Sequence, residues 1–157
     1  VSERLFYPED VPAEFEVCFL GRSTSYRERM LAPLKSQLRI VHVAHGLSDE
    51  HARSIMNRSQ IVLNLHNEEY PNFETRVVQA LRCRRWLVSE PLTGSRLIPG
   101  RDFVEVTTPQ GLLQEVTRLL RETPLHPAPP DLSLFTMDSL LSKVAAALEL
   151  VPARMIA

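Results

Sequence analysis

The amino-acid sequence predicts an α/β fold in which a parallel sheet of about five strands carries helices on both faces. Short apolar runs rich in β-forming residues alternate along the chain with longer runs of helical spacing. This alternation is typical of a parallel sheet built from βαβ units. Residues 61–90 give the clearest example, since strand, polar loop, helix and strand follow one another there as one crossover.

Each expected strand is a short apolar run bounded by polar or turn-forming residues. The first run, FEVCFL, is interrupted only by Glu16, and the run Trp86-Leu87-Val88 restarts a strand after the central helix. The strands are expected at residues 15–20, 39–44, 61–65, 86–88 and 102–106.

Each expected helix carries apolar residues on one side, as in the set Met30, Leu31, Leu34 and Leu38. The helices are expected at residues 26–38, 48–58, 73–84 and 110–121. Ser25, Ser48 and Thr108 stand at the starts of three of them and are expected to act as caps. Pro33 lies inside the first helix and is expected to kink it or delay its start.

The alternation of strands and helices stops after residue 122. Four prolines at 124–130 predict an extended connector, and an apolar stripe then predicts a C-terminal amphipathic helix that must cover something apolar. The stripe consists of Met137, Leu140, Leu141, Val144, Leu148 and Val151. The expected organisation is a linker at 1–14 from a further N-terminal domain, a Rossmann-like domain at 15–123, a connector at 124–136 and the helix at 137–151.

Composition excludes several classes of function. A chain of 157 residues suffices for one domain with a core, and 44% hydrophobic and 24% charged residues are ordinary for a soluble protein. The net charge of −1 provides no general attraction to nucleic acid or to an anionic membrane. No apolar run approaches the roughly 18 residues of a membrane span, and no signal peptide is expected. Cys18 and Cys83 make no disulfide framework. A cytoplasmic protein is therefore expected.

Polar residues follow the first predicted strand, at the sheet edge where open α/β sheets bind ligands. Gly21, Arg22, Ser23 and Arg27 lie in and just after the turn into the next helix. Backbone N–H groups, a helix amino end, hydroxyls and two cations are a combination that attracts phosphate. Glycine and serine in such a turn also have a purely geometric explanation.

A second polar group follows the strand at 61–65. It consists of His66, Asn67, Asn72, Glu74 and Arg76. His66 either orients a ligand hydroxyl or is a hydrogen-bonded structural residue. Glu74 either meets a ligand or, as an acid at the start of a helix, compensates the helix dipole or caps the helix. Arg76 opposes the dipole and therefore needs an anionic partner, either a diphosphate or Glu74.

Two further clusters have simpler explanations. His42, His45 and His51 match no spacing of a metal site, so no metal is expected. The run Arg82, Arg84 and Arg85 is expected to form the solvated end of a helix, with a contact surface for another domain as the alternative.

The run LNLHNEEYPNFETRVVQALRCRRWLVSEPL resembles the nucleotide-sugar-binding half of retaining group 1 glycosyltransferases, which have the GT-B fold, and most of all the spore-maturation CgeB-like branch. In that branch a strand reading roughly L-N-x-H precedes a polar loop, the motif R-x-F-E-A-L-A-C-G and an apolar strand. The matching residues here are Asn64, His66, Arg76, Gln79, Ala80, Leu81 and Cys83. Residues 5–8 and 15–21 are similar to the segment that leads into the family's second domain, so the resemblance covers about residues 2–122.

The resemblance implies that the polar loop faces the donor sugar and diphosphate, and that the side chain at Gln79 holds the ribose. The family has glutamate at that position and glycine at the position of Arg84. The first hypothesis is therefore the donor-binding half of a glycosyltransferase, which binds a nucleotide-diphosphate sugar without a cofactor. The acceptor site would belong to an N-terminal domain or a partner chain, so the chain alone is expected to be inactive, and no catalytic residue is assigned.

Two other hypotheses follow. A non-catalytic protein-interaction module derived from a glycosyltransferase domain is favoured by Gln79 and Arg84. A phosphoacceptor receiver domain is excluded, because no aspartate pair ends the first strand and no aspartate ends the strand at 61–65. The C-terminal helix is expected to dock on its own domain, on the other domain or on a second copy of the chain.

Overall fold

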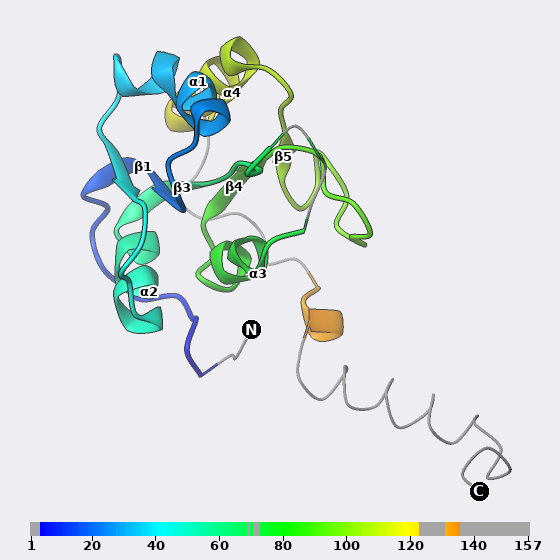
Figure 1. Ribbon diagram of the computed structural model, residues 1–157. Coiled ribbons are helices and arrows are strands. Elements are labelled where there is room, and N and C mark those ends of the chain that lie inside the picture. The colour runs from blue at the N-terminus through cyan, green and yellow to red at the C-terminus, as the bar shows by residue number, and fades with distance from the viewer. Residues whose placement is uncertain (1–3, 69, 71–72, 123–130, 136–157) are drawn as a thin grey trace, which may run out of the picture.

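A computed structural model describes residues 4–68, 70, 73–122 and 131–135. These residues form three layers, with a parallel sheet between two pairs of helices (Figure 1). The predicted helix at 137–151 and the prolines at 124–130 lie outside the described residues. The predicted fold class, a Rossmann-like sheet with helices on both faces, is confirmed.

The described residues contain the five strands and four helices that the sequence predicts. The strands are β1 (Phe15–Leu20), β2 (Ile40–Val43), β3 (Ser59–Asn64), β4 (Trp86–Ser89) and β5 (Val104–Glu105). The helices are α1 (Ser25–Lys35), α2 (Asp49–Asn57), α3 (Thr75–Arg82) and α4 (Pro109–Glu122), and a short 3-10 turn, η1 (Ser133–Phe135), follows. None of the helices in these described ranges is long and apolar enough to cross a bilayer.

Side-chain caps set the starts of three helices. Ser48 accepts a hydrogen bond from the backbone N–H of His51 at 3.3 Å, and Thr108 accepts one from Gly111 at 3.0 Å, as predicted. The prediction for α1 is wrong by one residue, because Thr24 is the cap and its hydroxyl accepts from the N–H of Arg27 at 3.3 Å. Pro33 lies inside α1 without delaying its start.

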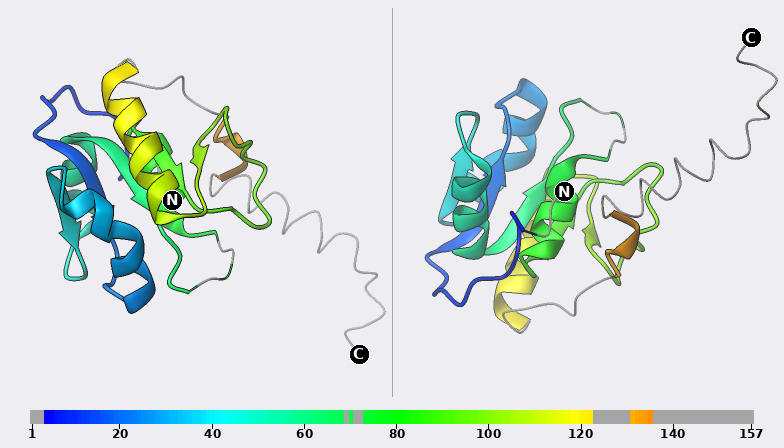
Figure 2. Two further views of the ribbon diagram at one scale, coloured as in Figure 1. Left: turned by 90° about the horizontal axis from the view of Figure 1, so that it is seen from above. Right: turned by 90° about the horizontal axis from the view of Figure 1, so that it is seen from below.

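The strand order β2-β1-β3-β4-β5 reverses direction at β1. Cys18 of β1 pairs with Val41 on one side and with Val62 on the other. Because parallel crossovers are right-handed, this reversal places α1 and α2 on opposite faces of the sheet. Figure 2 shows α1 and α4 side by side over one face, while α2 and α3 cover the other.

Alternate residues of the central strands divide the core into two halves. Phe19 and Leu63 belong to the half under α1 and α4, whereas Cys18 and Val62 belong to the half under α2 and α3. All four side chains are completely buried. This is why the strands read as nearly continuous apolar runs rather than as a polar and apolar alternation.

The segment before β1 is fastened to α2. Asn57 donates a hydrogen bond to the carbonyl of Tyr7 at 3.0 Å and accepts one from the N–H of Glu9 at 3.0 Å. Arg53 pairs with the carboxylate of Glu9 at 2.7 Å. Phe6 is 3% exposed and belongs to the core under α2 and α3, so this segment completes that half of the core.

The predicted solvated end of α3 is wrong for Arg85. Its side chain is buried and donates to the amide oxygen of Asn57 at 3.3 Å. Burial lowers the pKa of this guanidinium, and the nearby Cys83, Cys18 and Glu9 raise it. Arg84 is exposed but has a φ of 52°, the left-handed region that favours glycine. The glycine of the resembled family therefore falls where this chain reverses from α3 into β4.

Replacing Arg84 by glycine is expected to raise the free energy of unfolding by about 0.5–1 kcal/mol. It relieves a left-handed backbone that costs an L side chain about 1–2 kcal/mol, and the greater freedom of glycine in the unfolded chain offsets about 0.4–1 kcal/mol of this gain. Arg82→Gly is the control, since this residue has helical backbone geometry within α3 and its substitution is expected to cost about 1 kcal/mol. Chemical denaturation measures both values. A loss of stability in both variants would contradict the backbone explanation.

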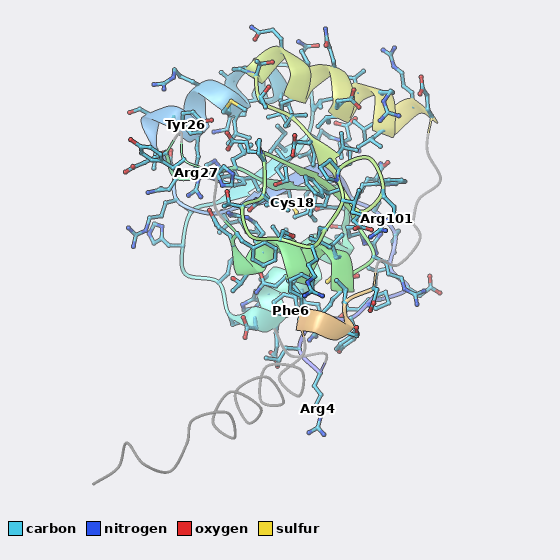
Figure 3. The ribbon with its side chains drawn as sticks, turned by 90° about the vertical axis from the view of Figure 1, so that its right-hand side faces the viewer. Arg4, Phe6, Cys18, Tyr26, Arg27 and Arg101 are labelled. Atoms are coloured by element: carbon cyan, nitrogen blue, oxygen red, sulfur yellow. The ribbon has the colours of Figure 1, made fainter. Side chains whose placement is uncertain are left out.

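Both cysteines lie in the core under α2 and α3 as free thiols, and Figure 3 shows Cys18 in the middle of the molecule. Burial raises the pKa of Cys18 to about 11 and that of Cys83 to about 12. An unfolded thiol ionises near pH 8.5. The protein therefore keeps both protons where the unfolded chain loses them, and this contribution to stability is lost as pH rises from about 8.5 towards the folded pKa values.

The free energy of unfolding of the wild type is accordingly expected to fall more steeply between pH 8 and pH 10 than that of Cys83→Ala. The difference in the fall should be about 1–2 kcal/mol, the linkage of one thiol. The cavity left by the alanine costs the same at every pH and cancels in this comparison. Parallel curves for the two proteins would show that Cys83 ionises normally.

Candidate functional site

The candidate site lies at the carboxyl ends of β1 and β3, where the strand order reverses. One loop leaves β1 at Gly21, and another leaves β3 at Leu65. The hydroxyl of Thr24 donates to the carbonyl of Asn67 at 3.3 Å, so the two loops are in contact. Open α/β sheets bind their ligands at such a reversal.

Arg27 ties the two loops together. Its side chain is 5% exposed, and Figure 3 shows it next to Tyr26 at this end of the molecule. The guanidinium donates to the carbonyl of Leu65 at 2.8 Å, to that of His66 at 2.9 Å and to that of Arg22 at 3.2 Å. The predicted cation is therefore present, but its donors hold backbone carbonyls.

Arg76 does the same from α3. Its side chain is 6% exposed and donates to the carbonyl of Leu20 and, at 3.3 Å, to the amide oxygen of Asn64. The ring of Phe19 lies beneath both guanidiniums, with its centroid 4.8 Å from the Cζ of Arg76 and 5.2 Å from that of Arg27. Cation–π contacts of this kind favour a desolvated cation.

Glu74 joins the two cations. One carboxylate oxygen meets Arg27 at 2.9 Å and the other meets Arg76, so a single carboxylate bridges both guanidiniums. We call these three side chains the arginine network. The anionic partner that Arg76 needs is therefore Glu74. The capping alternative for Glu74 is wrong, because its side chain makes no cap hydrogen bond although its backbone occupies the N-cap position of α3.

Desolvation changes the acidity of both cations. Burial lowers the pKa of Arg76 to about 10, although the charge of Glu74 acts in the opposite direction. Burial also lowers the pKa of Arg27, and Glu74 and Glu90 oppose it. Both guanidiniums therefore stay charged at neutral pH in a site that is largely closed to water.

Gly21 allows the network to approach β1. A Cβ at this position would lie 2.5 Å from Nη1 of Arg76 and 3.4 Å from Nη1 of Arg27. The backbone here is also fixed, since the N–H of Gly21 donates to Val43 at 2.9 Å and its carbonyl is 2.9 Å from Nε2 of His42. Glycine is needed for space rather than for an unusual φ.

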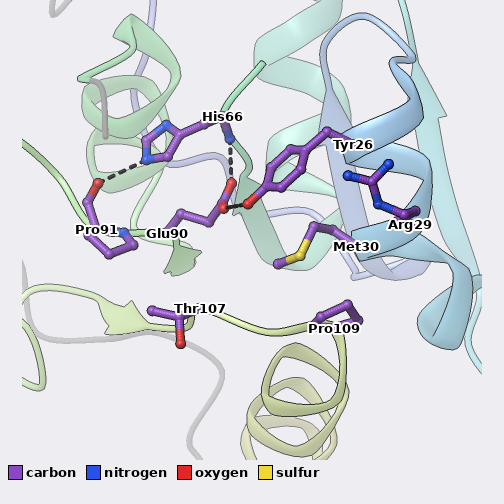
Figure 4. A pocket seen from close by; sticks show the side chains of 8 residues that line it. All are labelled: Tyr26, Arg29, Met30, His66, Glu90, Pro91, Thr107 and Pro109. Atoms are coloured by element: carbon purple, nitrogen blue, oxygen red, sulfur yellow. Dashed lines mark hydrogen bonds between the residues drawn. The ribbon is translucent and has the colours of Figure 1, made fainter. Parts of the chain in front are cut away.

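A cavity of about 450 Å³ opens beside the network (Figure 4). Its walls come from α1, from the ends of β3 and β4 and from the start of α4. The lining residues are Tyr26, Arg29, Met30, His66, Glu90, Pro91, Thr107 and Pro109.

Glu90 is the buried acid of this cavity and is 4% exposed. Its carboxylate accepts the backbone N–H of His66 at 2.6 Å and the hydroxyl of Tyr26. The ring of His66 donates from Nε2 to the carbonyl of Pro91 at 2.8 Å, because a carbonyl can only accept. Nδ1 of His66 is buried without a partner among the described residues.

The predicted site residues thus separate into groups. Gly21, Arg27, Glu74 and Arg76 meet in one place, while Arg22, Ser23 and Asn67 are exposed on the two loops. His66 lines the cavity and is held as a structural residue. Gln79 is half-buried in the second turn of α3, and Asn72 lies outside the described residues.

Sequence reasoning missed Tyr26, Glu90 and Thr107. The rule that selected His66 applies equally to Glu90, which directly follows β4 at the same edge. The three histidines considered for a metal do not converge, since His42 contacts Gly21 and His51 contacts Ser48. The described ranges contain no cluster of three potential metal ligands.

Solved structures of similar fold include the C-terminal domain of a glycosyl transferase group 1 family protein (LpcC) from Francisella tularensis. The two structures superimpose with a TM-score of 0.61. The match covers 80% of this chain and 90% of that chain at 10% sequence identity, which establishes a shared fold. No family model and no curated protein matches the sequence.

Gly21→Ala is expected to destabilise the protein by about 1–3 kcal/mol, because the new methyl group forces the guanidinium of Arg76 away from β1. A double-mutant cycle with Arg76→Met identifies the cause. If the contact with Arg76 dominates, the cost of Gly21→Ala should fall by at least half in the Arg76→Met background. A cost that persists in full would assign it to Phe19, whose ring lies 3.1 Å from the added Cβ.

Proposed function

We propose that this chain is the donor-binding half of a GT-B glycosyltransferase, and that a nucleoside-diphosphate sugar binds along residues 21–27 and 67–79. The fold of the group 1 glycosyltransferase domain supports this proposal, and so does the resemblance of residues 63–92 to the CgeB-like branch. Both arguments point to the edge at which the strand order reverses.

The observation that carries the proposal is the amino end of α3, which no side chain of the described residues caps. The helix begins at this edge, has no acidic residue in its first turn and has no side-chain cap. Glu74, whose backbone is at the cap position, is held by Arg27 and Arg76 instead. An uncapped helix amino end favours an anion, and α1 begins at the same edge with exposed Arg22 beside it.

The two buried arginines act as positioning residues in this proposal. Their donors are engaged with backbone carbonyls and with Glu74, and only 4–5% of each residue is exposed. A diphosphate would therefore meet the exposed loops and helix ends that the arginines fix in place. Preorganised donors of this kind bind an anion without first having to be ordered.

Gln79 remains the proposed contact of the ribose. Its neutral amide can accept a hydroxyl proton, but it lacks the added strength of a charged acceptor. The acceptor substrate is proposed to bind to an N-terminal domain or a partner chain, so this chain should bind donor without transferring sugar. A derived interaction module, the second candidate, would bind no nucleotide.

Titration of the isotopically labelled chain with uridine and guanosine diphosphates tests the proposal. We expect weak binding, with backbone amide shifts concentrated in residues 21–27 and 67–79. Gln79→Glu should then tighten binding by about tenfold, the value of a charge-assisted hydrogen bond. Gln114→Glu places the same substitution at an exposed position of α4 and should have no effect.

The outcomes separate the two candidates. Chemical-shift changes in the loops after β1 and β3, together with tighter binding in Gln79→Glu, support a donor domain. An absence of shifts with either nucleotide would favour the interaction module. Weaker binding in Gln79→Glu would refute the role given to α3.

A further inference from the structure

The cavity beside the arginine network contains an acid that the donor-binding edge does not use. At about 450 Å³, it lies within the size range of small-molecule sites. Figure 4 shows the carboxylate of Glu90 between the backbone of His66 and the hydroxyl of Tyr26, with Met30, Thr107 and Pro109 across the opening.

The carboxylate of Glu90 has unused capacity for hydrogen bonds. Two oxygens offer about four acceptor positions, and the described residues fill two of them, through the N–H of His66 and the hydroxyl of Tyr26. Both donors are neutral. A buried carboxylate is stable only when donors satisfy it, so a ligand that supplies two more would be bound here.

The rest of the cavity limits what this ligand can be. Arg29 lines the cavity and disfavours a cationic ligand, whereas the buried charge of Glu90 disfavours an anionic one. Met30, Pro91, Pro109 and the ring of Tyr26 provide apolar surface, and Thr107 adds a hydroxyl. These walls suit a neutral ring with apolar faces and hydroxyl groups at its edge.

We propose that the cavity binds a vicinal diol of a carbohydrate ring, with Glu90 accepting one hydrogen bond from each hydroxyl. A carboxylate at the end of a parallel strand binds ribose hydroxyls in the same way in other α/β sheets. The inference rests on the proposed function, since a donor bound along the adjacent edge carries such a ring. Ribose and hexose share this chemistry, and the experiment distinguishes them. A hexose in the cavity is compatible with Gln79 as the contact of the ribose, whereas a ribose there would replace that contact, because Gln79 does not line the cavity.

The test is calorimetric titration of the whole chain with four probes: a nucleoside diphosphate, its dideoxyribose analogue, the corresponding nucleotide-glucose and methyl glucoside. Glu90→Gln keeps the shape of the side chain and can still accept from His66, so the fold should survive. Glu105→Gln, exposed at the end of β5 and outside the cavity, is the matched control. Thr107→Trp fills the cavity from an exposed position and tests it without altering a buried charge.

If ribose occupies the cavity, the wild type should prefer the nucleoside diphosphate to its dideoxy analogue by about tenfold, and Glu90→Gln should abolish this preference. If hexose occupies it, Glu90→Gln should weaken the two probes that carry glucose, again by about tenfold, and leave the nucleoside diphosphate and its dideoxy analogue unchanged. Thr107→Trp should weaken the same ligand as Glu90→Gln in either case. Glu105→Gln should match the wild type.

The diol assignment is overturned if Glu90→Gln and Thr107→Trp both bind all four probes as the wild type does, while nucleotide still shifts residues 21–27; the proposed function would survive that result. In the converse result, the wild type binds methyl glucoside but no nucleotide, and Glu90→Gln no longer binds methyl glucoside. It would retain the diol site and refute the donor domain. Absence of all binding would overturn both.

Discussion

The bridge from Glu74 to Arg27 and Arg76 is the interaction on which the geometry at the carboxyl ends of β1 and β3 depends. Two buried guanidiniums share one half-buried carboxylate between the ends of β1 and β3. Removing Glu74 would leave two buried guanidiniums without their anionic partner, which costs far more than an exposed ion pair contributes. The remaining arginine donors fix the carbonyls of Leu20, Leu65 and His66, so the geometry of both loops follows from this one bridge.

The polar groups at the carboxyl edge of the sheet therefore have two different roles. Buried charges hold the backbone, and exposed groups such as Arg22 and Asn67 are left to meet a ligand. A second buried acid, Glu90, secures the end of β4 to α1 through Tyr26 and to the loop after β3 through His66. Three consecutive strands of the sheet, β1, β3 and β4, thus have their carboxyl ends joined by polar contacts, which limits how far the loops can move on binding.

Local patterns predicted the fold well, because each strand is a distinct apolar run and Ser48 and Thr108 are the evident hydroxyl caps before their helices. Tertiary contacts account for the errors. Thr24 rather than Ser25 caps α1, and the same hydroxyl also contacts Asn67 from the far loop. The partner of Arg85 lies 28 residues away, and Arg27 and Glu74 are separated by 47. The rule that ligands bind at the carboxyl ends of parallel strands located most of the candidate site. It did not predict which of the polar side chains there pair with one another.

The order of the strands also has a consequence for association between copies of the domain. The long strands β1 and β3 are central, whereas the two at the margins, β2 and β5, have four and two residues. Edge strands this short present few unpaired backbone N–H and C=O groups to another molecule. Within the described residues, the sheet therefore gives little template for edge-to-edge aggregation, and the most β-prone sequences are shielded on both sides by their neighbours.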